Sequence, residues 1–236
     1  YLITGGAGGI GQVIATYLAQ SYGATVILTG RSAPTDAKAQ RCRELSQAGG
    51  KVRYLQADVT DGAAMQQLIA TIHRRFGPLN GVIHAAGLLA GGIGRDHAKA
   101  DFDRVLAPKL YGVLALDAAT RNEPLDCFLL VSSLSAVIGA GGHAAYAAAN
   151  RSLDAFAEVR NRQVAAQQRQ GQTLSINWPL WQAGGMTHTD HAVALSDTDG
   201  IAALEACGRM GQPQLVVINA ADADSLAKLP LHNLAV

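Results

Sequence analysis

A serine and a tyrosine with the right spacing could deliver a proton to a carbonyl group. Tyr146 follows Ser133 by thirteen positions, and Asn150 stands four positions after the tyrosine. A phenol has a free pKa of about 10, so it is a useful acid at neutral pH only where neighbouring groups stabilise its phenolate. The phenol of the tyrosine and the hydroxyl of the serine could both approach one carbonyl oxygen. Tyr146 is therefore the candidate proton donor.

A glycine-rich segment provides a second candidate site, for a dinucleotide. It contains the pattern G-x-G-x-x-G between an expected strand and an expected helix, where glycines let backbone amides approach a pyrophosphate at the helix N-terminus. A tight turn without ligand is the alternative, but the strand and helix context favours binding. The predicted contacts are Thr4, Gly5, Gly6, Gly8, Gly9, Ile10 and Gly11.

The end of the second expected strand bears on the type of dinucleotide. An NAD site usually has an acidic residue there, about 20 positions after the glycines, whereas this chain reads Thr29-Gly30-Arg31-Ser32. A guanidinium can bind a 2′-phosphate through charge-assisted hydrogen bonds, and Ser32 can add a donor. The sequence favours NADPH over NADH, although Arg31 as a solvated loop residue is the alternative.

Small residues at the ends of the third and fourth strands leave space for the same cofactor. Asp58 and Val59 are expected beside the adenine, with Asp58 as a helix cap near Ala63 as the alternative. The nicotinamide ribose is expected beside the segment Ala85, Ala86 and Gly87.

The elements that position these residues alternate between short apolar runs and longer segments of helical period, which is typical of a parallel sheet. The pattern predicts one α/β domain with a Rossmann-like, doubly wound sheet of about seven mostly parallel strands and helices on both faces. The expected strands are Tyr1–Thr4, Thr25–Thr29, Lys51–Ala57, Gly81–Ala85, Phe128–Ser132, Leu174–Asn177 and Leu215–Ile218. The expected helices are Gly9–Ser21, Thr35–Ala48, Ala63–Phe76, Lys99–Thr120, Tyr146–Arg169 and Asp197–Met210.

The composition argues against several kinds of partner and site. The 236 residues are 49% hydrophobic and 16% charged, and 19 basic against 18 acidic residues give +1 without a basic run. This balance argues against nucleic acid and membrane surfaces as partners. The cysteines Cys42, Cys127 and Cys207 show no Cys-x-x-Cys spacing, which favours a reducing cytoplasm over a disulfide framework or a zinc site.

Taken together, the glycine pattern, His84-Ala85-Ala86-Gly87, Ser133 and Tyr146 resemble the short-chain dehydrogenase/reductase superfamily over nearly the whole chain. Most of that superfamily has a lysine where this chain has Asn150, and here Lys109 occurs in Leu106-Ala107-Pro108-Lys109. This exchange of lysine and asparagine resembles the ketoreductase domains of modular polyketide synthases.

The resemblance implies reduction of a β-keto thioester tethered to an acyl carrier protein, with NADPH as hydride donor. Tyr146 would donate the proton and Ser133 would bind the developing alkoxide, while Lys109 and Asn150 would steady the phenolate, the ribose and a relay water. A nearby positive charge favours a phenolate, so Lys109 is physically suited to that role.

The segment from Ser175 to Trp181, which includes Pro179 as a predicted cofactor contact, also resembles ketoreductases, especially those of assembly lines whose acyltransferase is a separate protein. Trp178 and Trp181 are equally consistent with cofactor or substrate contact and with packing. His188 and His191 stand three apart without a nearby third ligand, so a lid is favoured over a metal site.

The loop after His-Ala-Ala-Gly bears on the configuration of the alcohol product. Ketoreductases that give the D-hydroxyl generally carry an Asp in the loop after His-Ala-Ala-Gly, and this chain has Leu88-Leu89-Ala90-Gly91-Gly92 there. The resemblance therefore favours the L-hydroxyl, or A-type, product. Ile138 replaces the Trp common in that class. His143 resembles the histidine of a subset that also reduces α-epimerised substrates, with an exposed loop imidazole as the alternative.

The resemblance further implies a cofactor-free structural half-domain before the catalytic one, which these residues do not contain. We expect the domain at residues 1–236 to act as a monomer beside the other domains of a synthase. Two other hypotheses are a free-standing reductase or epimerase of a small metabolite and a non-catalytic nucleotide-binding scaffold. The Lys/Asn exchange argues against the first, and the presence of Ser133, Tyr146, Lys109 and Asn150 together argues against the second.

Overall fold

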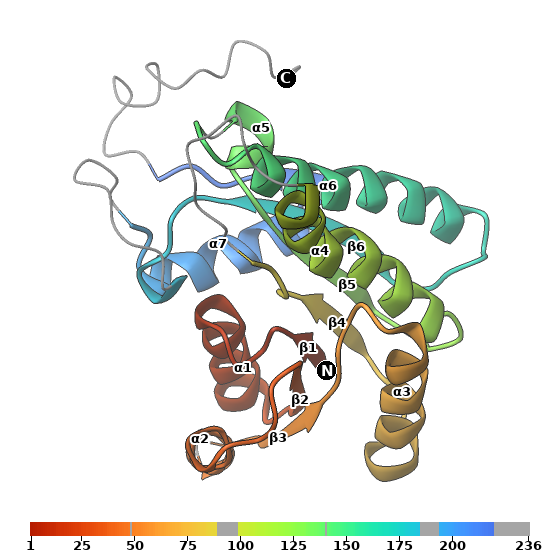
Figure 1. Ribbon diagram of the computed structural model, residues 1–236. Coiled ribbons are helices and arrows are strands. Elements are labelled where there is room, and N and C mark those ends of the chain that lie inside the picture. The colour runs from red at the N-terminus through yellow and green to blue at the C-terminus, as the bar shows by residue number, and fades with distance from the viewer. Residues whose placement is uncertain (48, 89–98, 140, 185–193, 220–236) are drawn as a thin grey trace.

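The protein is built on a seven-stranded sheet in which every pair of adjacent strands runs parallel. The computed structural model describes residues 1–47, 49–88, 99–139, 141–184 and 194–219 (Figure 1). The strand order is β3-β2-β1-β4-β5-β6-β7, which confirms the predicted doubly wound sheet. The strands are β1 (Leu2–Thr4), β2 (Thr25–Gly30), β3 (Lys51–Gln56), β4 (Gly81–His84), β5 (Cys127–Ser133), β6 (Gln172–Trp178) and β7 (Gln214–Val216).

The helices follow the predicted order, with differences at their ends. They are α1 (Gly9–Tyr22), α2 (Asp36–Gln47), α3 (Gly62–Phe76), α4 (Lys99–Ala119), α5 (Ser135–Ile138), α6 (Ala144–Ala165), the 3₁₀ turn η1 (Gln182–Gly184) and α7 (Asp197–Arg209). α6 begins two residues before Tyr146 and stops well before Arg169, because Gln167 has a φ of 58° that no helix can continue through. α5 and η1 were not expected, since elements this short carry no hydrophobic period.

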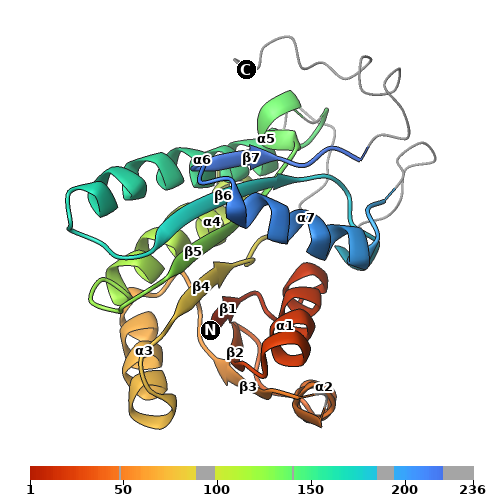
Figure 2. The same ribbon diagram turned by 180° about the vertical axis from the view of Figure 1, so that it is seen from behind.

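Each face of the sheet has its own apolar core. On one face α1, α2 and α7 pack on side chains such as Ile3, Leu28 and Ile176. On the other face α3, α4 and α6 pack on Leu2, Val82 and other strand residues whose side chains point to that face (Figures 1 and 2). Strands buried on both faces explain the nearly continuous apolar runs of the sequence.

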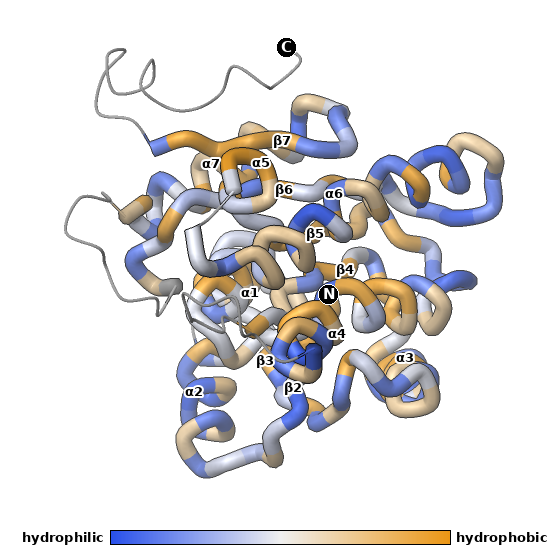
Figure 3. Tube along the Cα trace, turned by 45° about the horizontal axis from the view of Figure 1, so that its top comes forward, coloured by the Kyte–Doolittle hydropathy of each residue, from blue (hydrophilic) through white to orange (hydrophobic). Residues whose placement is uncertain are grey.

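Hydrophobic residues are concentrated in the strands, although some large ones, such as Tyr22 and Tyr111, are exposed on helices. Figure 3 shows hydrophobic residues in strands such as β4 and β7, whereas much of α2 is hydrophilic. Among the helices that the structure describes, none has the length and apolar character needed to cross a membrane.

Strand order fixes where the site must be. From β1 the chain moves outward through β2 to β3, and then returns to place β4 on the other side of β1. In open parallel sheets, ligands bind outside the carboxyl ends of the strands at such a reversal. Thr4 and His84 end the two strands that flank it, and their side chains hydrogen-bond to each other, 2.7 Å between Thr4 Oγ1 and His84 Nδ1.

Candidate active site

The turn from β1 to α1 brings the backbone close to β4. Gly5 has a φ of 66°, and a Cβ there would lie 2.7 Å from the carbonyl oxygen of Ala85 and from backbone atoms of Ala86. Only glycine fits this conformation and this contact. The turn leads directly into α1, whose N-cap residue is Gly8, so the first amides of the helix face the end of the sheet. This arrangement fits a bound pyrophosphate.

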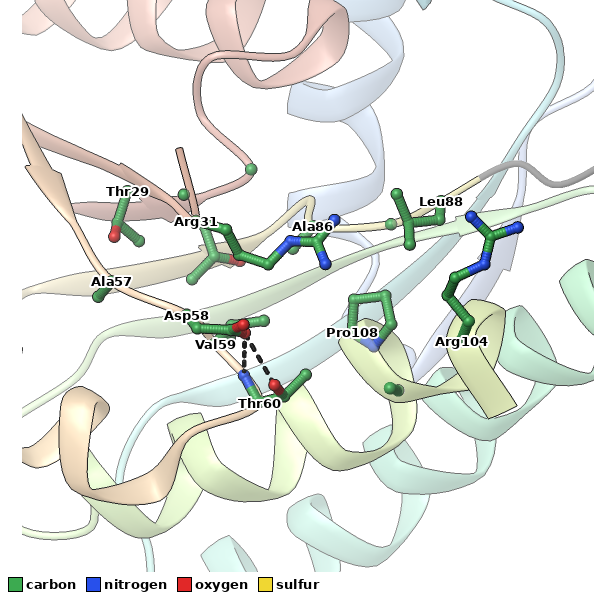
Figure 4. Close-up of a pocket in the computed structure, with 15 residues that line it drawn as sticks. Thr29, Arg31, Ala57, Asp58, Val59, Thr60, Ala86, Leu88, Arg104 and Pro108 are labelled. Carbon is green, nitrogen blue, oxygen red and sulfur yellow. Dashed lines mark hydrogen bonds between the residues drawn. The ribbon is translucent and has the colours of Figure 1, made fainter. Parts of the chain in front are cut away.

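A first cavity of about 220 Å³ lies over the ends of β1, β2, β3 and β4 (Figure 4). Seven predicted cofactor residues line it: Thr4, Gly5, Arg31, Asp58, Val59, Ala86 and Gly87. Arg31 lies at the side formed by β2 and β3, and Arg104 and Pro108 of α4 lie across from it (Figure 4). The sequence reasoning missed Arg104, although its position one helical turn before Pro108, in the segment that contains the predicted Lys109, could have indicated it.

Asp58 does not cap α3. Its Oδ1 atom accepts hydrogen bonds from the backbone N–H and the hydroxyl of Thr60, at 2.9 and 2.8 Å. The cap is Asp61, which accepts from the amides of Ala63 and Ala64. The capping alternative for Asp58 is therefore wrong, and its carboxylate is held at the wall of the first cavity.

A second cavity of about 200 Å³ adjoins the first and contains the candidate catalytic groups. The two share Gly5, Gly87 and Leu88 as lining residues, so they lie side by side. Ser133, Tyr146 and Lys109 all line the second cavity, although they come from β5, α6 and α4. The other predicted residues that line it are Gly5, Gly8, Gly9, Ile10, Gly11, Ala85, Gly87 and Pro179.

Lys109 is buried, and its ammonium group is fixed on the sheet. Its side chain crosses from α4 so that Nζ donates a hydrogen bond to the carbonyl oxygen of Val131, at 2.7 Å. Burial lowers its pKa to about 8, and the carboxylate of Asp154 opposes that change. The neighbouring His84 is fully buried, which lowers its pKa to about 3 and leaves its imidazole neutral.

Ser133 and Asn150 are held by local hydrogen bonds. Ser133 Oγ accepts from the backbone N–H of Ser135 at 3.2 Å and lies 3.0 Å from its hydroxyl. Asn150 is fully buried and lines neither cavity. Its Nδ2 atom donates to the carbonyl oxygen of Tyr146 at 2.8 Å, and its Oδ1 atom has no hydrogen-bond partner among the described residues.

Two predicted cofactor residues, Gly6 and Ser32, line neither cavity. Gly6 is a packing position, since a Cβ there would lie 2.8 Å from a methyl group of Leu28. The hydroxyl of Ser32 accepts a 2.6 Å hydrogen bond from Nζ of Lys38, which also lies 4.6 Å from the ring centre of Tyr54. Lys38, in the first turn of α2, is a second cation near the end of β2 that the sequence reasoning did not select.

The two tryptophans pack against each other. Their ring centres are 4.9 Å apart at 82°, and both side chains are buried. Trp181 packs on Gly200 of α7 and lines neither cavity, so it is a packing residue. Trp178 lines the second cavity as well. The predictions for His188 and His191, and for the loop residues 89–92, lie outside the described part of the chain.

Comparison with known proteins identifies the family. The KR domain model matches residues 1–183. The chain is 46% identical over 187 residues to polyketide synthase PksN of Bacillus subtilis and 40% identical over 228 residues to PksL of the same organism. These matches cover 79% and 92% of the chain, but only 3% and 5% of those synthases.

Solved structures that resemble this protein belong to the same family. A ketoreductase domain from the bacillaene assembly line superposes with a TM-score of 0.93 at 37% identity, over 97% of this chain and 58% of the other. An N-terminal ketoreductase from the macrolactin assembly line gives 0.89 at 41% identity, over 97% of this chain and 46% of the other. A reductase that shares this fold, at 24% identity and a TM-score of 0.77, is complexed with NAD. The chain belongs to the KR domain family, the ketoreductase domains of polyketide synthases.

Proposed function

We propose that the domain uses NADPH to reduce a β-ketoacyl thioester, carried by an acyl carrier protein, to the β-hydroxyacyl thioester. The observation that carries this proposal is that Ser133, Tyr146 and Lys109 line one cavity beside another that contains Arg31. A groove with polar catalytic groups at one end and a cation at the other suits an extended dinucleotide with its nicotinamide beside the ketone.

The protein's own groups act on the ketone oxygen. When bound, NADPH supplies a hydride to the β-carbon. Tyr146 donates a proton to the oxygen, and Ser133 donates a hydrogen bond to it as negative charge develops there. Lys109 stabilises the resulting phenolate through its charge. Asn150, which is buried behind the tyrosine, holds the first turns of α6 in place, and its unpartnered Oδ1 atom is available to a relay water.

Selection of NADPH over NADH rests on positive charge near the end of β2. Arg31 lines the first cavity, Lys38 supports Ser32 at its edge, and Arg104 lies on the opposite wall. β2 ends at Gly30 and is followed by Arg31 and Ser32, without the carboxylate that would bind a ribose 2′-hydroxyl. A 2′-phosphate therefore finds cations and a hydroxyl at this position.

The partners follow from the relatives, which are much longer synthases. We infer that this domain acts beside other domains, including a structural half-domain outside residues 1–236, and on a substrate delivered by an acyl carrier protein. The relatives PksN and PksL support a synthase of the type whose acyltransferase is a separate protein.

For the product we propose the L-hydroxyl, A-type configuration, because the segment Leu88-Leu89-Ala90-Gly91-Gly92 that follows Gly87 contains no Asp. A structure described as an A-type ketoreductase is 31% identical to this chain with a TM-score of 0.81, which is compatible with this assignment. Chiral analysis of the alcohol formed from a β-ketoacyl thioester tests it, and a D-hydroxyl product would refute it.

Substitution of Tyr146 tests the chemistry. Tyr146→Phe removes the acid and keeps the ring, so ketone reduction should fall at least a hundredfold, the lower limit for loss of a general acid of this kind. Binding of NADPH, followed by its fluorescence, should be retained. Tyr111→Phe, on an exposed turn of α4, is the matched control and should reduce the substrate normally. Undiminished reduction by Tyr146→Phe would exclude the role, and activity only on small free ketones would favour a free-standing reductase.

A further inference from the structure

A second serine stands directly behind the candidate catalytic serine. Ser133 is the last residue of β5, Leu134 turns the chain, and Ser135 is the first residue of α5. This turn brings the backbone N–H and the side chain of Ser135 back onto the hydroxyl of Ser133. Ser135 is half-buried and lines neither of the two site cavities, whereas Ser133 lines the second. A direct contact between Ser135 and a bound ligand is therefore not expected.

Two hydrogen bonds from Ser135 reach the same oxygen atom. Ser133 Oγ accepts one from the backbone N–H of Ser135 at 3.2 Å and one from the Ser135 hydroxyl at 3.0 Å. A serine hydroxyl has two acceptor sites and one donor proton. Both acceptor sites of Ser133 are therefore occupied from the protein side, and its own proton remains for a partner in the second cavity.

The surroundings of the two hydroxyls favour this direction of the bond between them. Within the described part of the chain, the Ser135 hydroxyl has no acceptor other than Ser133 Oγ. The hydroxyl of Ser133, by contrast, has an open cavity in front of it. Donation by Ser135 satisfies both hydroxyls once a carbonyl oxygen occupies that cavity, whereas the opposite direction leaves the carbonyl oxygen without a hydrogen bond from Ser133.

Other hydrogen bonds fix the backbone of Ser133 but not its hydroxyl. The carbonyl oxygen of Ser133 accepts from Nδ2 of Asn177 at 3.1 Å. The backbone N–H of Leu134 donates to the carbonyl oxygen of Trp178 at 2.8 Å. These bonds leave the side chain free to rotate among its staggered positions. Only the bonds from Ser135 restrict that rotation among the hydrogen bonds of the described residues.

We propose that Ser135 is a positioning residue for the ketone reduction: its amide and hydroxyl fill both acceptor sites of Ser133 Oγ and so direct the Ser133 proton toward the ketone oxygen. A donor that is oriented in advance needs no reorganisation when negative charge develops on that oxygen. The catalytic part of this inference rests on the proposed function. The orientation of the two hydroxyls is a property of the protein without cofactor or substrate.

Substitution of Ser135 separates kcat from the binding of cofactor. Ser135→Ala removes the hydroxyl and keeps the backbone N–H, so kcat for a β-ketoacyl thioester should fall about threefold to tenfold, the usual net contribution of one hydrogen bond. The KM for NADPH should change by less than about twofold, because Ser135 lines neither cavity. Ser135→Thr keeps a hydroxyl and should retain kcat within about twofold. An unchanged kcat in Ser135→Ala would overturn the proposal.

Ser152→Ala is the matched control for loss of a serine hydroxyl near the site. Ser152 lies on α6, its hydroxyl donates to the carbonyl oxygen of Ala149 at 2.7 Å, and it lines neither cavity. This change should leave kcat within about twofold of the unaltered protein. A fall as large as that in Ser135→Ala would show that the effect is not particular to Ser135, and the proposal would be wrong.

A second background tests whether Ser135 acts through Ser133. Ser133→Ala removes the oriented hydroxyl and should lower kcat about a hundredfold or more, as loss of an oxyanion donor does. In that background Ser135→Ala should lower kcat further by less than about twofold, because no hydroxyl remains to be oriented. An equal loss in both backgrounds would indicate a general effect on the surrounding chain and would contradict the positioning role.

Neutron diffraction from deuterium-exchanged crystals of the unaltered, cofactor-free protein reads the orientation directly and needs no variant. We expect the deuteron of Ser135 to lie on the line to Ser133 Oγ, and the deuteron of Ser133 to point into the second cavity. A Ser133 deuteron directed at Ser135 Oγ would overturn the proposal. If the hydroxyls are oriented as expected but the unaltered protein reduces no β-ketoacyl thioester, the proposed function is wrong and the orientation alone is confirmed.

Discussion

Replacement of Arg31 by alanine should separate the two nicotinamide cofactors. The guanidinium lines the first cavity, where it is exposed, and the same wall carries the carboxylate of Asp58 (Figure 4). We expect the exposed contact between Arg31 and the phosphate to contribute about 1.5 kcal/mol to the free energy of binding, which is the lower end of the range for hydrogen bonds to charged groups. That corresponds to a rise of roughly tenfold in the KM for NADPH. The KM for NADH should change by less than about twofold, because NADH has no 2′-phosphate for Arg31 to bind.

The assay is the initial rate of reduction of a β-ketoacyl thioester at varied NADPH or NADH. Arg104→Ala should raise the KM for NADPH less than Arg31→Ala does, since Asp101 already pairs with Arg104 at 3.2 Å. Arg75→Ala, at the end of α3 and outside both cavities, is the control for loss of one positive charge. Equal rises in the KM for NADPH and NADH in Arg31→Ala would refute the assignment.

Two further predictions concern stability, measured by urea unfolding. A Cβ at Gly200 would clash with the ring of Trp181, so Gly200→Ala should lower the free energy of unfolding by about 1–3 kcal/mol; Gly208→Ala on the same helix meets open space and should raise it by about 0.5–1 kcal/mol. Equal effects of the two changes would contradict the packing described for α7. Asp117 is buried between Arg160 and Arg169, at 2.8 and 2.9 Å, so Asp117→Ala should lower the free energy of unfolding by about 3–5 kcal/mol. A decrease below about 1 kcal/mol would show that this cluster of charges contributes little to stability.

The sequence predicted the order of elements well because each strand of a parallel sheet is buried on both faces. Such strands are apolar throughout, and the helices between them carry a clear period. The errors are at element ends and in the two short elements, α5 and η1, which were not expected. The period could not show that Gln167 takes a positive φ after α6, or that Asp61 rather than Asp58 caps α3.

By itself the sequence determined which residue types could do the chemistry. Ser133, Tyr146 and the glycine turn were recognisable because their spacing relative to strand ends is constrained by the fold, whereas Lys109 was recognisable only from the resemblance to ketoreductases. Their roles remain predictions until the variants are tested. Three residues distant in sequence lie in one cavity only because β5 ends, and α4 and α6 begin, at the same edge of the sheet.

Only the tertiary structure decided what surrounds these groups. Burial depends on contacts between distant segments, so the sequence could not show that Lys109 is enclosed and bonded to Val131, that Trp181 packs away from both cavities, or that Lys38 supports Ser32. The charge environment of the site follows from the same packing. Asp154 has no motif that distinguishes it, yet α6 and β6 together bury its carboxylate against the side chains of Ser175 and Asn177.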